Sequence, residues 1–102
     1  MQDFLLIRIN ESGAIIWKKN YGAHKKDILK SLKSTKDGGY ITAGYSNSEY
    51  PDTRYDEVYD FLVYKLNSQG EIQWKEYYGG SDIDCGFDIT QTSDGGYIIC
   101  GY

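Results

Sequence analysis

The sequence predicts an all-β fold, and three observations carry this prediction. Residues 3–45 align without a gap with residues 60–102, so the 102-residue chain consists of two copies of one unit. Eleven Tyr and twelve Gly against a single Pro favour strands joined by tight turns. Each copy also contains the sequence Thr-x-Asp-Gly-Gly-Tyr-Ile, at residues 35–41 and 92–98, in which Asp-Gly is a strong hairpin signal.

The chain is expected to form one small domain over residues 1–102. It divides into a first repeat at residues 3–45, a long loop at residues 46–59 and a second repeat at residues 60–102. Because the two repeats are equivalent in sequence, each segment should have the same conformation in both.

The first strand of each unit is predicted at residues 3–10 and 60–67. Both segments are short, rich in large apolar and β-branched residues, and followed by a turn that ends in Gly13 or Gly70. We expect a type I turn with a left-handed glycine bulge at each of these positions.

The second and third strands follow in the same order in both copies. The second is predicted at residues 14–21 and 71–78, each of which contains a Trp. The third, at residues 28–35 and 85–92, is ambiguous, because the first copy alone also fits a helix. The second copy opposes a helix, since it contains Gly86 and two Thr residues, so we predict a strand for both.

The fourth strand is predicted at residues 40–45 and 97–102. It follows the Asp-Gly pairs at residues 37–38 and 94–95. We expect type I′ turns there, with positive φ at both central residues.

Four short strands per unit, joined by close connections, predict an up-and-down antiparallel sheet. Such a sheet repeated in tandem is the blade of a β-propeller. The patterns Thr-x-Asp-Gly-Gly-Tyr-Ile-x-x-Gly, Asp-Phe-Leu-x-x-(Arg/Lys)-(Ile/Leu)-Asn-x-x-Gly-x-Ile-x-Trp and Tyr-Gly-Gly-Ser resemble the propeller-type repeats of many bacterial secreted and surface proteins. The layout is also similar to kelch blades. The resemblance implies a secreted or cell-surface setting and a scaffold role.

A kelch-like phase makes the central part of the chain one complete blade. Its strands, from the innermost to the outermost, would be residues 27–35, 40–45, 60–67 and 71–78. The chain would begin with the outer half of one blade and close with the inner half of another, each with an exposed edge and an uncovered apolar face. We therefore expect a homo-oligomer, in which three copies give six blades and four give eight. The alternative is a fragment of a longer propeller.

The long loop and the connections between blades are expected to emerge on one face of the propeller, opposite the face with the Asp-Gly and Asn-x-x-Gly turns. Exposed loops on a rigid scaffold are common binding sites, and Tyr supplies contact area at low entropic cost. We expect a glycan or another protein to bind there, the alternative being a loop that is merely solvated. The candidate residues are Tyr50, Asp52, Arg54, Tyr55, Asp56, Glu57 and Tyr59 of the loop, with His24, Ser81 and Asp82 of the connections.

Charge and hydropathy argue against two classes of partner. The net charge is −4 with no basic stripe, so we expect no nucleic acid partner. No apolar run approaches the roughly 18 residues that cross a bilayer, so we expect no membrane span. The first three residues lack the features of a signal peptide.

The acidic residues Asp52, Asp56, Glu57 and Asp60 lack the spacing and the glycine of a calcium loop. His24 is the only His in the chain, so a zinc site would have too few ligands. A nucleophilic side chain would likewise lack a supported histidine base. We therefore expect no metal, no cofactor and no catalytic residue. An enzyme would need Asp27 and Asp84, near the start of the inner strands, to converge at the ring centre.

The two cysteines are expected to be unpaired. Cys85 aligns with Ile28 and Cys100 aligns with Ala43, which are apolar or small residues. Both thiols should therefore be buried and free. Trp17 and Trp74 recur at one strand position, which is typical of packing between neighbouring blades.

Overall fold

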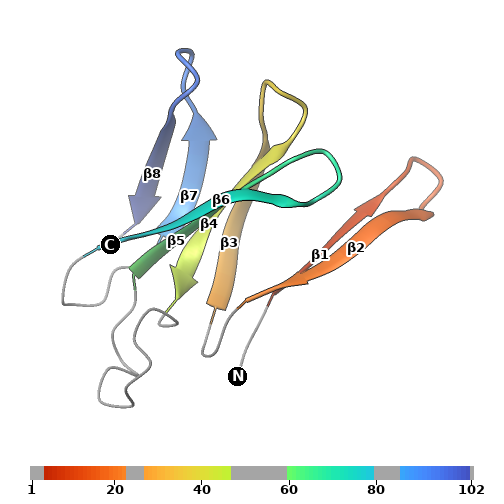
Figure 1. Ribbon diagram of the computed structural model, residues 1–102, viewed down its shortest axis with the longest axis horizontal. Coiled ribbons are helices and arrows are strands. Elements are labelled where there is room, and N and C mark those ends of the chain that lie inside the picture. The colour runs from red at the N-terminus through yellow and green to blue at the C-terminus, as the bar shows by residue number, and fades with distance from the viewer. Residues whose placement is uncertain (1–3, 23–26, 47–59, 80–85, 102) are drawn as a thin grey trace.

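The strands expected from the repeat are present in the computed structural model, which describes residues 4–22, 27–46, 60–79 and 86–101. Within these ranges every regular element is a β-strand, which confirms the all-β prediction (Figure 1). The elements are β1 (Phe4–Ile9), β2 (Ile15–Tyr21), β3 (Asp27–Ser34), β4 (Tyr40–Ser46), β5 (Asp60–Leu66), β6 (Ile72–Tyr78), β7 (Gly86–Gln91) and β8 (Tyr97–Gly101). The ambiguous third segment is a strand in both copies.

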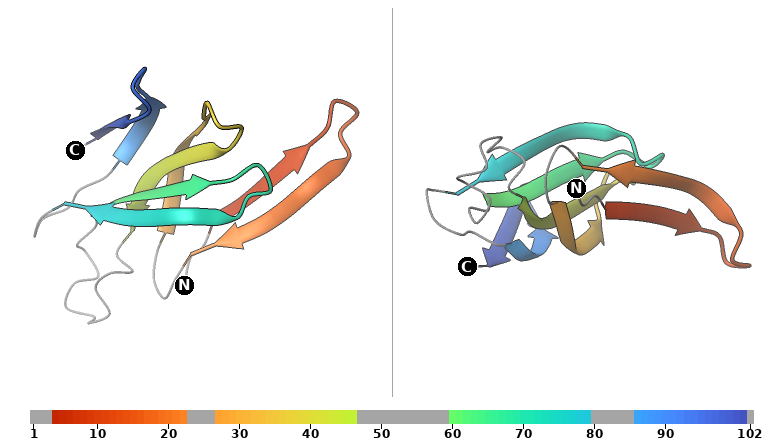
Figure 2. Two further views of the ribbon diagram at one scale, coloured as in Figure 1. Left: turned by 45° about the horizontal axis from the view of Figure 1, so that its top comes forward. Right: turned by 90° about the horizontal axis from the view of Figure 1, so that it is seen from below.

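The strands form three antiparallel sheets. The central sheet has four strands in the order β3-β4-β5-β6, and β1-β2 and β7-β8 are two-stranded sheets. Figures 1 and 2 show the two hairpins flanking the central sheet, with all four tight turns at the same end of the molecule. The predicted order of the four central strands is confirmed.

All four hairpin turns share one backbone geometry. The glycines with positive φ in these turns are Gly13, Gly38, Gly70 and Gly95. In the β3–β4 turn, the amide of Gly38 donates to the carbonyl of Thr35 at 3.1 Å, and the amide of Thr35 donates to the carbonyl of Gly39 at 3.0 Å. This pattern is a three-residue type I turn with a glycine bulge.

The prediction of type I′ turns at the Asp-Gly pairs was wrong. Among the described residues, only glycines have positive φ, so Asp37 and Asp94 remain in the ordinary region. The physical reason is the aspartate side chain. Oδ1 of Asp37 accepts hydrogen bonds from the amide of Gly39 at 3.0 Å and from the hydroxyl of Thr35, which stabilises the type I conformation.

One face of the central sheet packs against the β1–β2 hairpin. The buried side chains of this first core are Tyr21, Leu62, Tyr64 and Leu66, with Phe4, Leu6, Tyr40 and Tyr77 partly buried around them. The rings of Phe4 and Tyr21 stack with centroids 5.4 Å apart. The ring of Tyr64 lies tilted at 5.4 Å from Phe4 and 5.7 Å from Tyr21, so three aromatic rings close this face.

The opposite face packs against the β7–β8 hairpin. The buried side chains of this second core are Ile41, Ala43, Val63 and Ile89, with Tyr97 and Ile99 partly buried beside them. Neighbouring residues along β4 and β5 thus belong to different cores, as expected for strands whose side chains alternate between two buried faces.

Gly39 and Gly44 let strand backbones approach closely. A Cβ atom at Gly39 would overlap the carbonyl oxygen of Leu66, and one at Gly44 would overlap the carbonyl oxygen of Ile28. Neither residue has positive φ. Both positions therefore require glycine for space and not for backbone conformation.

Cys100 differs from its prediction. Its thiol is free, as expected, but it is exposed and not buried. Cys100 lies on β8, which pairs only with β7. The equivalent Ala43 is buried, because it lies on β4, which has a strand on each side. Cys85 lies outside the described residues.

The first core predicts a large difference between two facing residues. Leu66 is fully buried, whereas Ile72, opposite it on β6, is about half exposed. We expect Leu66→Ala to lower the free energy of unfolding by about 2 to 5 kcal/mol, because it leaves a cavity. Ile72→Ala should change it by less than about 1 kcal/mol. Urea unfolding at one protein concentration measures both, and equal losses would contradict this packing.

Candidate functional site

The side chains predicted to form the binding face lie outside the described residues. They are His24, Tyr50, Asp52, Arg54, Tyr55, Asp56, Glu57, Tyr59, Ser81 and Asp82. Asp84, one of the two carboxylates considered for a reaction at a ring centre, also lies outside them. The structure describes the strand ends that flank residues 47–59.

Those strand ends form a buried polar junction. Asp27 of β3 lies opposite Ser46 of β4, and Ser46 lies opposite Asp60 of β5. All three residues are buried, and the hydroxyl of Ser46 donates a hydrogen bond to Oδ1 of Asp27. Buried polar groups with such partners fix the strand ends, so the two ends of the long loop start from a rigid base.

An apolar groove of about 570 Å³ lies between the outer part of the central sheet and the β7–β8 hairpin. Its lining residues come from the two sides in nearly equal number: Phe61, Val63, Trp74 and Tyr78 from β5 and β6, and Ile89, Tyr97 and Ile99 from β7 and β8. Four of these seven side chains are aromatic and the other three are aliphatic, so the groove is a surface that water solvates poorly.

The groove is bordered by a contact that recurs on the other face of the sheet. The ring of Trp74 meets that of Tyr97 edge to face, with centroids 6.0 Å apart and planes at 63°. The equivalent Trp17 and Tyr40 meet at 6.1 Å and 70°. The two hairpins therefore flank the central sheet through the same pair of residue types in the same geometry.

The two faces differ in how completely they are covered. On the side of β1–β2, the central sheet contributes Leu62, Tyr64 and Leu66 of β5, and these fill the core. On the side of β7–β8, the hairpin has no strand in the described structure that corresponds to β5. The groove lies where the side chains of such a strand would be.

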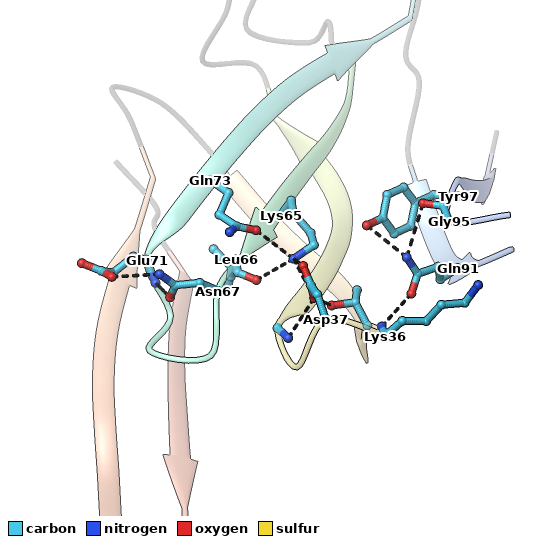
Figure 3. Close-up of polar contacts among 12 residues, drawn as sticks. Lys36, Asp37, Lys65, Leu66, Asn67, Glu71, Gln73, Gln91, Gly95 and Tyr97 are labelled. Atoms are coloured by element: carbon cyan, nitrogen blue, oxygen red, sulfur yellow. Dashed lines mark hydrogen bonds and ion pairs between the residues drawn. The ribbon is translucent and has the colours of Figure 1, made fainter. Parts of the chain in front are cut away.

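A polar cluster joins the β3–β4 turn to β5 (Figure 3). Lys65 is buried, with only 4% of its surface exposed. Its ammonium lies 3.0 Å from Oδ2 of Asp37. It also donates hydrogen bonds to the carbonyl of Leu66 at 3.0 Å and to Oε1 of Gln73 at 2.9 Å. A buried ammonium is tolerated when its donors have such partners. Hydrogen bonds from Thr35 and Lys65 hold the pKa of the Asp37 carboxyl well below its ordinary value.

Asp94 forms the same turn but lacks the cation. Its Oδ1 accepts hydrogen bonds from the hydroxyl of Thr92 and from the amide of Gly96 at 3.0 Å, and these bonds lower the pKa of the Asp94 carboxyl. Within the described part of the chain, no basic side chain forms an ion pair with it. Sequence reasoning assigned Asp37 and Asp94 to the turns alone. The missed signal is the basic residue that recurs at Arg8 and Lys65 within two largely apolar strands.

Polar contacts also join β3 to β7. The carboxylate of Asp88 accepts hydrogen bonds from the hydroxyl of Ser31 at 2.6 Å and from the ammonium of Lys33 at 3.0 Å. The amide of Lys36 donates to Oε1 of Gln91 at 2.9 Å (Figure 3). These bonds hold the β7–β8 hairpin against β3, an edge strand of the central sheet.

The Asp88 contacts predict an acid-sensitive part of the stability. Hydrogen bonds from Ser31 and Lys33 lower the pKa of the Asp88 carboxyl to about 2 from its ordinary 3.8. A carboxyl with a lowered pKa stabilises the fold above its ordinary pKa, and this stabilisation is lost as the pH falls towards its folded value. We therefore expect Asp88→Asn to lower the urea midpoint at neutral pH and to lose less stability than the unchanged protein between about pH 4 and pH 2. The same acid dependence in both proteins would contradict this role.

In the described ranges, no three potential metal-ligating side chains gather, and no helix has the length and apolar character that crossing a bilayer requires. No known protein-family model matches the sequence, and no curated protein matches it either.

Proposed function

We propose that this chain is a non-catalytic β-propeller repeat protein that self-assembles through shared blades and presents a loop face to a glycan or another protein. In this proposal β3 to β6 form one blade, β1 and β2 are the outer half of one neighbour, and β7 and β8 are the inner half of the other. Three copies would make six blades and four copies eight, within the typical range of propellers. The repeats resemble those of bacterial secreted and surface proteins.

The observation that carries the proposal is the equivalent packing on both faces of the central sheet. Trp17 meets Tyr40 on one face as Trp74 meets Tyr97 on the other. A repeated contact between successive sheets is what a propeller requires, because each blade buries its faces against its two neighbours. In a sandwich of two sheets, by contrast, each sheet buries only one of its faces.

The polar junction of Asp27, Ser46 and Asp60 supports a loop face at the end of the sheet opposite the tight turns. Binding loops function best on such a fixed base. The proposed binding residues are those named from the sequence, chiefly Tyr50, Tyr55 and Asp56.

The second candidate function is a purely structural unit, or a segment of a larger secreted propeller with no ligand site of its own. The apolar groove favours it. Its walls belong to two different sheets, β5 and β6 on one side and β7 and β8 on the other, which fits assembly better than ligand binding.

Self-assembly predicts the mass in solution. We expect light scattering to give three or four times the chain mass of 11.7 kDa. The physical reason is that the exposed sheet edges and apolar faces are buried only when copies associate. A folded species of 11.7 kDa at every concentration tested would contradict self-assembly.

If a glycan binds at the loop face, its affinity should depend on the side chains of the loop. A glycan array should identify a bound sugar, and the double variant Tyr55→Ala with Asp56→Ala should weaken that binding about tenfold or more, because truncated contact residues remove most of the energy of an interface. Ser93→Ala, in a tight turn at the other end, is the matched control. An array without a bound glycan, or binding unchanged in the double variant, would favour the structural unit.

A further inference from the structure

We propose that the open edge of β8 takes up β1 of a second copy in the register that β4 and β5 already have, and that Gly96 and an ion pair between Asp94 and the partner's Arg8 select this register. The inference depends on the proposed self-assembly and adds the residues that specify it. Its template is within the chain, because β1 is the repeat equivalent of β5 and β8 is that of β4.

The register follows from the pairing of β4 with β5. Tyr40 lies opposite Leu66 and Ile41 lies opposite Lys65, without a bulge along the pair. The equivalent pairing would place Tyr97 opposite the partner's Ile9 and Ile98 opposite the partner's Arg8. A shift by one residue would turn Leu5 and Ile7 away from the groove and would turn towards it Phe4 and Leu6, which already pack in the first core of their own chain, so only this parity is compatible with both contacts.

The exposed face of β1 supplies what the groove lacks. Leu5, Ile7 and Ile9 are 48%, 48% and 56% exposed. Their equivalents on β5 are Leu62, Tyr64 and Leu66, which are 3%, 2% and 0% exposed. In the proposed register, the three β1 side chains would lie on the same sheet face as Ile99 and Tyr97, next to the groove. Their burial would supply the driving force for pairing.

The groove also contains two donors whose equivalents bond to a neighbouring turn. The indole of Trp17 donates to the carbonyl of Ser68 at 3.0 Å, and the hydroxyl of Tyr21 donates to the carbonyl of Gly70. The corresponding donors are those of Trp74 and Tyr78, which line the groove. In the assembled ring, the turn between the partner's β1 and β2 would supply the matching carbonyls.

The charge pair follows from the same correspondence. Lys65 reaches Asp37 across the β4–β5 pair, with 3.0 Å between Nζ and Oδ2. Arg8 and Asp94 are the equivalents of these two residues, but they lie on hairpins at opposite sides of the central sheet (Figure 1). One chain therefore keeps them apart, and two chains in the proposed register bring them together. A charge match at one position favours the correct register over shifted ones.

Gly96 supplies an independent steric argument. Its equivalent Gly39 must be glycine because a Cβ atom there would overlap the carbonyl oxygen of Leu66 on the adjacent strand. At Gly96, a Cβ atom would meet only side-chain oxygens of Asp94 and Thr92, at 3.3 Å, and φ is not positive. Within one chain, an alanine at this position would require these two oxygens to shift by a few tenths of an ångström, but it would overlap no backbone atom. A second copy would place the carbonyl of the partner's Ile9 against it.

The test compares two equivalent substitutions. Gly39→Ala should destabilise each chain, because Leu66 belongs to the same chain. Gly96→Ala should leave the circular dichroism spectrum of the chain unchanged but raise the dissociation constant of the oligomer about tenfold or more in sedimentation equilibrium, because backbone atoms would overlap. Ser93→Ala, in the same turn, is the control and should assemble normally.

A double-mutant cycle tests the ion pair. Arg8→Gln and Asp94→Asn, which keeps a side-chain oxygen in the turn, should each weaken assembly, and their combined effect on the dissociation constant should depart from additivity by roughly twofold to fivefold. Lys18→Gln combined with Asp94→Asn should be additive. The equivalent Lys75 lies over the rings of Tyr64 and Tyr77, 6.0 and 5.9 Å from their centroids, and not at Asp37.

The outcomes separate this inference from the proposed function. An oligomer that forms equally well with Gly96→Ala, or additive effects of Arg8→Gln and Asp94→Asn, would overturn the register while self-assembly stands. A folded single copy would overturn both, and the edge of β8 would then have another occupant, such as a further repeat of a longer chain. Loss of assembly in Gly96→Ala with an intact spectrum, together with coupling in the cycle, would support the inference.

Discussion

The arrangement of the molecule depends on a sheet that is apolar on both faces. Along β4 and β5, Ile41 and Val63 point to one face while Tyr64 and Leu66 point to the other, and all four are buried. A sheet of this kind cannot be stable with one face in water, because exposure of either set would forfeit the hydrophobic contribution of half the core. The flanking hairpins cover the two faces of the central sheet. Each hairpin in turn has an outer face with exposed apolar side chains, such as Ile7 of β1 and Ile98 of β8.

The Thr-Asp-Gly-Gly turn has a second role in addition to reversing the chain. Asp37 fixes the turn through Thr35 and Gly39 and also faces the buried ammonium of Lys65. The carboxylate thus stabilises a turn and compensates a charge that burial would otherwise penalise. In the second copy, Asp94 retains the first role, but Arg8, the repeat equivalent of Lys65, lies near the other end of the same chain. One repeated sequence therefore gives a turn aspartate with a buried cationic partner in the first copy and one without it in the second.

Much of the fold could be predicted from the repeat. The comparison of equivalent segments resolved the third strand, where Ile28 and Leu32 alone fit a helix, because Gly86 and its neighbours exclude one in the second copy. The backbone type of the Asp-Gly turns was predicted wrongly, since dipeptide preference takes no account of the bonds that Asp37 makes to Thr35 and Gly39. The predicted binding residues of the long loop stay a prediction. The groove was not anticipated, because its walls belong to two different sheets and their packing is not visible in the sequence.

The sequence by itself determined the strands, their order in the central sheet and the positions of the turns. Strands and turns depend on short stretches of sequence, and the repeat supplies a second copy of each stretch for comparison. Tertiary structure decided what repetition cannot: equivalent residues have unequal surroundings. Cys100 is exposed where Ala43 is buried, and Ile9 is exposed where Leu66 is buried. The reason is that burial depends on which strand lies alongside, and a residue type carries no information about whether its neighbour is present.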